Sequence, residues 1–288
     1  MGYSIFEDTM VDQSWEEIEL AAKANVPVFL PLGVIEEHGP HLPLGTDCYL
    51  SYFTCKQLKN AMEKHGQKVM IAPPFYWGIN KATSGFPGSF STRPETMIAL
   101  LEDIFSNLKS WGFQHVFCFN AHGDYEHIKT AITAIERSRK QLNMNIRFVM
   151  EGFVLGRYGL TGEEDSVLPI DLKLPEEMFE EQKTQERGDE ETQEEKLDIH
   201  AGQIETAEML KYCPELVDTK TAKTLPSYSL TMEQLRIWNQ GGEATRELVP
   251  YGYAGNPAEY GQINDIDEVD QLLCEAGVKA IMGSIGKE

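Results

Sequence analysis

Short apolar runs alternate with longer segments of helical periodicity along the first half of this chain. The runs that indicate strands are 26–32, 68–73, 115–120 and 146–150, and the segments that indicate helices are 15–24, 47–64, 94–111 and 125–141. Strands joined by helices of about a dozen residues or more require crossover connections, so they pair in parallel within one sheet. The sequence therefore predicts an α/β fold with a mostly parallel central sheet that helices cover on both faces.

Composition limits the kinds of partner that such a fold can bind. The chain has 288 residues, of which 41% are hydrophobic, and this is enough for one large domain. Its formal net charge of -21 repels polyanions, so we expect neither nucleic acid nor an anionic membrane as a partner. The N-terminus shows no signal-peptide pattern, and no apolar run is long enough to cross a bilayer. A cytoplasmic location is the expectation that follows.

Cysteine usage gives no support for a disulfide framework. The five cysteines are odd in number and lie far apart without Cys-x-x-Cys spacing: Cys48, Cys55, Cys118, Cys213 and Cys274. The pattern also argues against a thiolate zinc site. We therefore expect reduced and mostly buried thiols.

Polar residues gather directly after two of the predicted strands. One cluster covers residues 36–47, after the run 26–32, and the other covers 120–127, after the run 115–120. In parallel α/β sheets, ligands bind outside the carboxyl ends of the strands, where loops from different strands meet. We therefore expect the two clusters to face each other across one pocket.

The residue types in these clusters suit a divalent metal. In an extended segment Glu36 and His38 share a face, and Asp47 returns from a loop rich in glycine and proline. The second cluster adds His122 and Asp124. Mixed carboxylate and imidazole ligands fit Zn²⁺, Mn²⁺ or Fe²⁺. The alternative is that each residue is simply a solvated turn residue, which is the better reading for any one of them alone but not for the whole set.

The stretch from Pro31 to Asp47, PLGVIEEHGPHLPLGTD, resembles the signature of the creatininase (creatinine amidohydrolase) family. Three further segments resemble family motifs in the same order: GFPGS at 85–89, NAHG at 120–123 and HAGQIET at 200–206. GNPA at 255–258 is a weaker match. The resemblance implies a three-layer α/β/α sandwich, a metal centre with one or two ions, and a homo-oligomer, frequently a hexamer built as a trimer of dimers.

The resemblance also implies a set of metal ligands. Carried over by position, Glu36, Asp47 and His122 would bind one ion. His38 and Asp47 would bind the second ion with an acid that follows His122, and the matching position here is Asp124. Asp47 would then bridge two ions per subunit. Glu126 or His127 would compete with Asp124 if the loop were shifted.

Further roles follow from the resemblance in the same way. His200 would be the catalytic general acid and base, and Glu205 would orient it or join the metal ligands. Without the motif, His200 is more simply a solvated residue at the start of a helix. Trp77, Ser89 and Asn120 are candidates for contact with substrate, although an aromatic residue at a strand end is more often part of the core.

Two departures from the family pattern bear on substrate. Creatininase has a tryptophan four residues before its catalytic histidine, where this chain has Lys196, and no tryptophan lies between Trp111 and Trp238. Gln203 also replaces an acid of the family motif. The missing tryptophan argues against creatinine itself, and Gln203 removes one negative charge near the centre. The second departure is the acidic segment 161–196. We expect a single domain 1–288 in which this segment is an exposed insertion. The alternative is a lid that folds over the pocket.

Three functions remain open at this point. The first is a metal-dependent hydrolase that breaks a C–N bond in a small cyclic amide or formamide. The second is a hydrolase of a C–C bond in a cyclic diketone such as a keto-inositol, because hydroxide attack on an activated carbonyl begins both reactions. The third is a non-catalytic metal-binding assembly protein, which would have no need of a proton-carrying residue such as His200.

Overall fold

The computed structural model describes residues 3–173 and 197–286. Its centre is a five-stranded sheet in the order β2-β1-β3-β4-β5, in which every neighbouring pair is parallel. The prediction of a mostly parallel sheet is therefore confirmed. The strands are β1 (Val28–Leu32), β2 (Met70–Ile71), β3 (His115–Asn120), β4 (Asn145–Glu151) and β5 (Val167–Ile170).

Strand β2 is shorter than the apolar run 68–73 from which it was predicted. The carbonyl of Phe29 in β1 accepts the Ala72 N–H at 2.8 Å, and the carbonyl of Pro31 accepts the Phe75 N–H at 2.9 Å. Between these two bonds the proline nitrogens of Pro31, Pro73 and Pro74 have no hydrogen to donate. The regular ladder therefore stops, and only isolated bridges continue beside β1, the first of them between Leu32 and Phe75.

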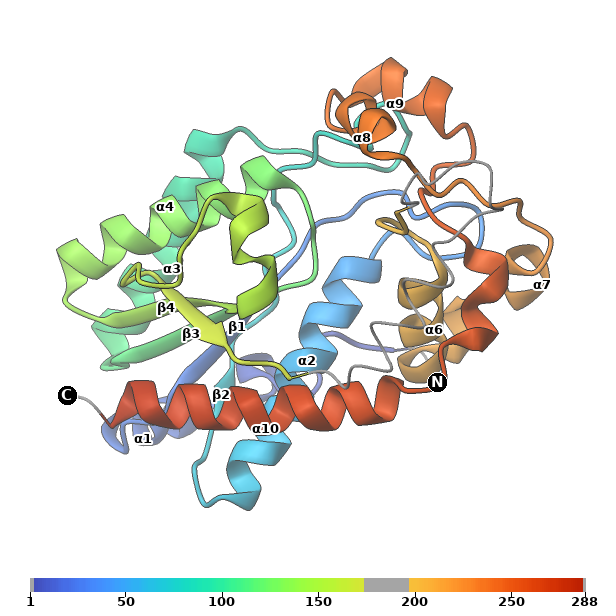
Figure 1. Ribbon diagram of the computed structural model, residues 1–288. Helices are drawn as coiled ribbons and strands as arrows, with labels where there is room; N and C mark the ends of the chain where they lie inside the picture. The colour runs from blue at the N-terminus through green and yellow to red at the C-terminus, as the bar shows by residue number, and fades with distance from the viewer. Residues whose placement is uncertain (1–2, 174–196, 287–288) are drawn as a thin grey trace.

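Helices cover both faces of the sheet, which confirms the three-layer α/β/α arrangement (Figure 1). On one face the core joins the strands to α1 (Trp15–Lys23), α3 (Pro94–Trp111) and α4 (Tyr125–Leu142). On the other face it joins them to α2 (Thr46–Lys64) and the long C-terminal helix α10 (Ile266–Ile285). Phe105 of α3 and Ile281 of α10 are fully buried, one in each core.

The remaining elements lie between β5 and α10 or join the main elements. They are α6 (Gln203–Tyr212), α7 (Thr219–Ala222), α8 (Met232–Trp238) and α9 (Gly242–Leu248), with the 3-10 segments η1 (Met10–Asp12), η2 (Gly152–Tyr158), η3 (Pro214–Leu216) and η4 (Pro257–Gln262). Helix α6 contacts both α2 and η4. This places the motif that begins at His200 beside the N-terminal half of the chain.

The acidic segment 161–196 differs in part from the expected solvated excursion. Residues 167–170 form β5, the edge strand beside β4, and Val167 and Ile170 are buried. The run Val-Leu-Pro-Ile is too short to stand out from its acidic surroundings, yet its apolar ends fit a pleated, half-buried edge. The part of the expected insertion or lid at 174–196 lies outside the described residues.

Among the described residues, none of the helices is both long and apolar enough to span a membrane.

Candidate metal centre

The two polar clusters meet at the carboxyl edge of the sheet, as expected from the parallel pairing. Leu32 at the end of β1 is in register with Asn120 at the end of β3, so the loops that follow start side by side. The first loop closes on itself through the Glu36 N–H, which donates to the Leu44 carbonyl at 3.0 Å. A Cβ atom on Gly33 would lie 3.0 Å from the backbone of Asp47, so glycine there lets α2 start close to β1.

A first group of three potential ligand atoms lies between the loops. The Nδ1 atom of His122 is 2.9 Å from Oε1 of Glu36 and 3.2 Å from Oδ2 of Asp47. All three side chains are at most 5% exposed. One imidazole and two carboxylates at this spacing form a mixed nitrogen and oxygen site of the kind that holds Zn²⁺ or Mn²⁺.

A second group shares Asp47 with the first. The Nε2 atom of His38 is 3.2 Å from Oδ1 of Asp47 and 3.8 Å from Oε2 of Glu205. Glu205 lies in the first turn of α6. Asp47 thus offers one oxygen to each histidine, which is the arrangement that a bridging carboxylate needs.

Hydrogen bonds fix the orientation of both histidine rings. Nδ1 of His38 lies 3.1 Å from the carbonyl oxygen of Glu36, and Nε2 of His122 lies 3.0 Å from the carbonyl oxygen of Ile79. A carbonyl oxygen can only accept, so these ring nitrogens carry the hydrogens. When the ring is neutral, its other nitrogen presents a lone pair to the carboxylate oxygens, and such an arrangement is favourable when a cation lies between them. The donor set therefore fits a divalent metal.

The electrostatics of the same residues point to a bound cation. Burial disfavours the charged imidazolium of His122, but Glu36 and Asp47 outweigh it and raise the pKa of His122 well above its usual value. Burial likewise opposes ionisation of Asp47, yet His38 and His122 hold the pKa of Asp47 well below its usual range. The metal-free site is therefore balanced by protons on its histidines, and a metal ion would replace those protons.

Asp124, which the family pattern suggests as a ligand of the second ion, lies apart from both groups. Its Oδ1 accepts the His127 N–H and its Oδ2 accepts the Lys81 N–H, each at 3.0 Å. The carboxylate thus caps the N-terminus of α4. Glu126 is exposed, and His127 is buried with its Nδ1 accepting the Ile79 N–H at 3.2 Å. Among the described residues, Glu205 takes the place beside His38 that the sequence assigned to Asp124.

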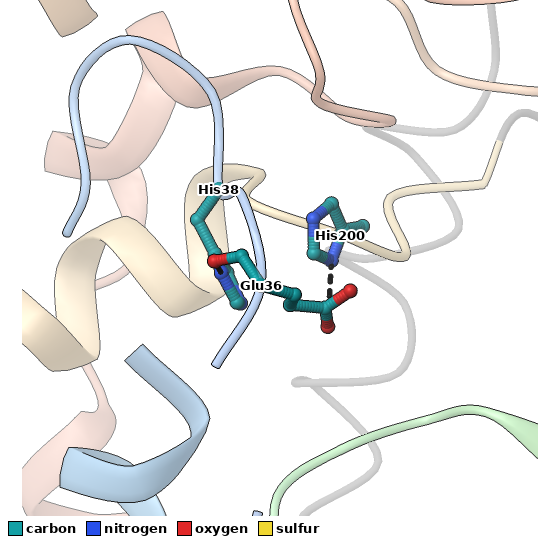
Figure 2. Close-up of side chains that lie close together, drawn as sticks. All are labelled: Glu36, His38 and His200. Atoms are coloured by element: carbon teal, nitrogen blue, oxygen red, sulfur yellow. Dashed lines mark hydrogen bonds and ion pairs between the residues drawn. The ribbon is translucent and has the colours of Figure 1, made fainter. Parts of the chain in front are cut away.

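His200 lies next to the metal ligands on an extended segment. Its Nδ1 is 3.9 Å from Oε1 of Glu36, and its ring centroid is 4.3 Å from that of His38. Figure 2 shows the His200 ring directed at the Glu36 carboxylate. These three residues form a further group of potential ligand atoms. Burial opposes protonation of His200, but Glu36, Glu37 and Glu205 raise its pKa to about 10. An imidazole in this position can carry a proton to or from a group bound at the metals.

The three candidate substrate contacts lie at different places. Asn120 lines a cavity of about 340 Å³ together with His122 and Glu205, and its Nδ2 donates to the His122 carbonyl at 2.6 Å. Ser89 instead supports the loop, because its Oγ accepts the Glu37 N–H at 3.1 Å. Trp77 is 44% exposed and lines a separate apolar groove, so the structure does not bring it to the metal ligands.

Some residues of the site were not expected from the sequence. The Thr83 hydroxyl donates to Oε2 of Glu36, and this bond leaves Oε1 of Glu36 facing the histidines. Trp238 of α8 packs on His200 with ring centroids 5.3 Å apart. An aromatic ring thus lies beside His200, although this chain has Lys196 where creatininase has a tryptophan. A threonine in a Gly/Pro-rich loop and a tryptophan far downstream carry no spacing signal that links them to the site.

The chain is similar to a known protein family and to several curated proteins. The model of the family described as Creatininase: Creatinine amidohydrolase matches residues 11–262. The mycofactocin precursor peptide peptidase of Mycolicibacterium smegmatis is 29% identical over 38% of this chain and 44% of its own length. The creatinine amidohydrolase of Pseudomonas putida is 26% identical over 49% of this chain and 53% of its own length. The 3-dehydro-scyllo-inosose hydrolase of Thermotoga maritima is 27% identical over 36% of this chain and 32% of its own length. The chain thus spans about half the length, or less, of the curated relatives that it matches.

Solved structures share the fold over almost the whole chain. A crystal structure of creatinine amidohydrolase (creatininase) has a TM-score of 0.63 and 22% identity, with 97% of both chains covered. A structure described as Creatininase Mn has a TM-score of 0.62 and 21% identity, with 96% of this chain and 97% of the other covered. A mutant creatininase of Zn-Zn type has a TM-score of 0.63 and 20% identity, with 99% of this chain and all of the other covered.

Proposed function

Because this chain belongs to the creatininase family, we propose that it is a metal-dependent hydrolase that breaks a C–N bond in a small cyclic amide or formamide. The observation that carries the proposal is the position of Asp47, which offers one carboxylate oxygen to His38 and the other to His122. When the rings are neutral, as metal binding requires, both nitrogens that face it carry lone pairs. A buried carboxylate in this position suits two ions better than any structural role.

The metal ions would be held by Glu36, Asp47 and His122 at one position and by His38, Asp47 and Glu205 at the other. When bound, divalent ions supply a polarised substrate carbonyl and a water of lowered pKa. We propose Zn²⁺ or Mn²⁺, with Fe²⁺ as a further candidate, and two ions per subunit. Structures of related proteins described as Mn and Zn-Zn forms support this choice.

The protein residues would bind the substrate and move the proton. The cavity beside His122 has room for a small molecule, and Asn120 presents its amide there. His200, which lies beside Glu36, would take the proton that the attacking water loses. It would then return that proton to the departing nitrogen, so that the amine leaves as a neutral group. The same proton is taken up and released, so the histidine is regenerated.

A second candidate is the hydrolysis of a C–C bond in a cyclic diketone such as a keto-inositol. The relative from Thermotoga maritima, a 3-dehydro-scyllo-inosose hydrolase, favours it. Attack on a polarised carbonyl begins both reactions, and His200 would then protonate carbon in place of nitrogen. The mycobacterial relative is a peptidase of a precursor peptide, so short peptides are also worth offering as amide substrates.

The test is mass spectrometry in ¹⁸O-labelled water. Protein loaded with zinc or manganese is offered a panel of cyclic amides, formamides, short peptides and keto-inositols, with the His200→Ala variant as the control. We expect a labelled carboxylate and a released amine from an amide, and neither product from the variant. Label in an opened keto-inositol would move the assignment to C–C cleavage. Stoichiometric metal without turnover of any panel member would favour a non-catalytic assembly protein.

We also propose that the enzyme acts as a single-domain homo-oligomer in the cytoplasm, with the hexamer as the first arrangement to test. Size-exclusion chromatography with light scattering gives the subunit number directly. A monomeric mass at working concentration would contradict the proposal.

A further inference from the structure

His200 is held from several directions, although it lies on an extended segment. Its backbone pairs with Ala254 in an antiparallel bridge, in which the Ala254 N–H donates to the His200 carbonyl at 2.8 Å. The ring packs against Trp238 and His38. The side chain is only 6% exposed. Such a ring has little freedom to rotate, so its two nitrogens keep different surroundings.

One ring nitrogen of His200 is engaged by a backbone oxygen. Nε2 lies 2.8 Å from the carbonyl oxygen of Glu37. Because a carbonyl oxygen can only accept, Nε2 must carry a hydrogen whether the ring is neutral or protonated. The only nitrogen that can gain and lose a proton without breaking this bond is Nδ1. Nδ1 lies 3.9 Å from Oε1 of Glu36. It is the ring nitrogen directed at that carboxylate in Figure 2.

Glu37 is itself fixed in the loop by contacts of its own. Its N–H donates to Oγ of Ser89 at 3.1 Å, and its Oε2 accepts the Gly39 N–H at 3.0 Å. Gly252 makes room for the carboxylate, since a Cβ atom there would lie 1.8 Å from Oε2. Only 7% of Glu37 is exposed. The carbonyl that receives the His200 hydrogen is therefore held in a defined place.

The tripeptide Glu36-Glu37-His38 consequently serves two parts of the site. Its outer residues belong to the candidate metal ligands, and its middle residue contacts His200. We propose that Glu37 is a positioning residue that holds His200 with its hydrogen on Nε2, so that Nδ1 is the atom that carries the proton in the reaction. This inference rests on the proposed function, because it assigns an atom to the proton transfer of that same site.

The first test locates the hydrogen without any substrate. Protein with ¹⁵N-labelled histidine rings and bound zinc is studied by magic-angle-spinning NMR, and the His200 signals are found by difference from the His200→Gln variant. We expect a protonated Nε2 and an unprotonated Nδ1 in the neutral ring. A neutral ring with its hydrogen on Nδ1 would overturn the proposal. If no panel substrate is hydrolysed by the unmodified protein, the proposed function fails, whereas this spectrum still decides where the hydrogen lies.

The second test uses variants that release or displace Glu37. Glu37→Ala removes the acceptor for the Gly39 N–H, and we expect kcat to fall about tenfold to a hundredfold with KM and metal content unchanged. Glu37→Gln keeps an oxygen for that bond and should restore most of the rate. Glu37→Ala with unchanged kcat, or with metal content that falls in parallel with kcat, would contradict the positioning role.

Gly252→Ala provides an independent displacement of Glu37. Gly252 has φ +77, so the substitution adds backbone strain as well as the clash with Oε2. Gly66→Ala is the matched control, because Gly66 has φ +81 and a Cβ atom there would meet nothing within 4 Å. We expect only Gly252→Ala to lower kcat and to change the His200 spectrum. Equal effects of the two variants would show that strain alone is responsible, which would overturn the assignment.

Discussion

At the scale of single residues, the site depends on side chains that share atoms and on hydrogen bonds that fix ring orientation. Asp47 belongs to both groups of candidate metal ligands. His200 belongs to neither of these two groups, although it lies beside Glu36. These two residues should therefore fail in different ways. The sequence allows this distinction to be predicted, because the family resemblance already separates the aspartate from the histidine.

Asp47→Ala should lose metal and activity together, and His200→Ala should keep metal and lose turnover. The reason is that Asp47 supplies an oxygen to each histidine, whereas His200 would act on the proton. The measurement is metal content by inductively coupled plasma mass spectrometry beside the rate on the best panel substrate. Turnover near that of the unmodified protein in either variant would remove that residue from its role.

Glu205 and Asp124 are the two candidates for the acid that binds the second ion beside His38, and their variants can be compared directly. Glu205→Gln should lower the metal content from two ions to one, because Glu205 lies beside His38. Asp124→Asn should keep both ions and cost at most about 1 kcal/mol of stability, because Asp124 caps α4. Titration with Mn²⁺ in a calorimeter counts the sites. The reverse pattern would return the ligand role to Asp124.

Both acids were named from the sequence as possible ligands, and the choice between them could not be made there for a physical reason. An aspartate just before a helical segment has the same pattern whether it caps the helix or binds a metal. Glu205 comes from a distant helix, and its approach to His38 depends on how α6 packs against α2. Only the packing of whole elements decides between the two acids.

At the scale of elements, strands and helices with clear periodicity were predicted and those without it were not. The four strands and four helices of the first half appear within a few residues of their expected bounds. Helix α10 was not predicted, because it contains Gly277 and Gly283 and glycine lowers helix propensity. Gly277 nevertheless lets α10 pack close to α2, since a Cβ atom would lie 2.6 Å from Cδ2 of Leu58 on α2.

The C-terminal part of α10 should therefore stabilise the fold, whereas Val269, Asp270 and Leu273 nearer its start line the cavity beside His122. Ile281→Ala is expected to lower the free energy of unfolding by about 2–5 kcal/mol, because Ile281 is fully buried against the sheet. The neighbouring Met282 is 39% exposed, so Met282→Ala is the matched control and should cost under about 1 kcal/mol. Urea denaturation measures both. A similar loss in the two variants would mean that α10 is not packed as described.

At the scale of the whole molecule, metal binding should couple stability to pH. Without metal, the carboxylates around His38 and His122 outweigh burial and raise the pKa of both imidazoles, so these rings keep protons that a free imidazole loses near pH 6.5. Their contribution to stability is complete below that pH and is lost as pH rises through the folded-state pKa. Metal must displace the same protons, so it binds more weakly as pH falls.

We therefore expect the rise in Tm caused by Mn²⁺ or Zn²⁺ to be larger near pH 8 than near pH 6. At a free metal concentration of about a hundred times Kd, the stabilisation is about 2.7 kcal/mol. Scanning calorimetry of metal-loaded and chelator-treated protein at both pH values gives the comparison, with Asp47→Ala as the control that should show no metal effect. An equal or larger shift near pH 6 would contradict the expected release of protons.

The origin of the ligands along the chain has a consequence for synthesis. Glu36, Asp47 and His122 all lie in the first half of the sequence, on loops that follow β1 and β3, whereas Glu205 is made later, after β5. Chains emerge from the ribosome with the N-terminal part first. The three ligands of one position are therefore all synthesised before Glu205, the last ligand of the other position.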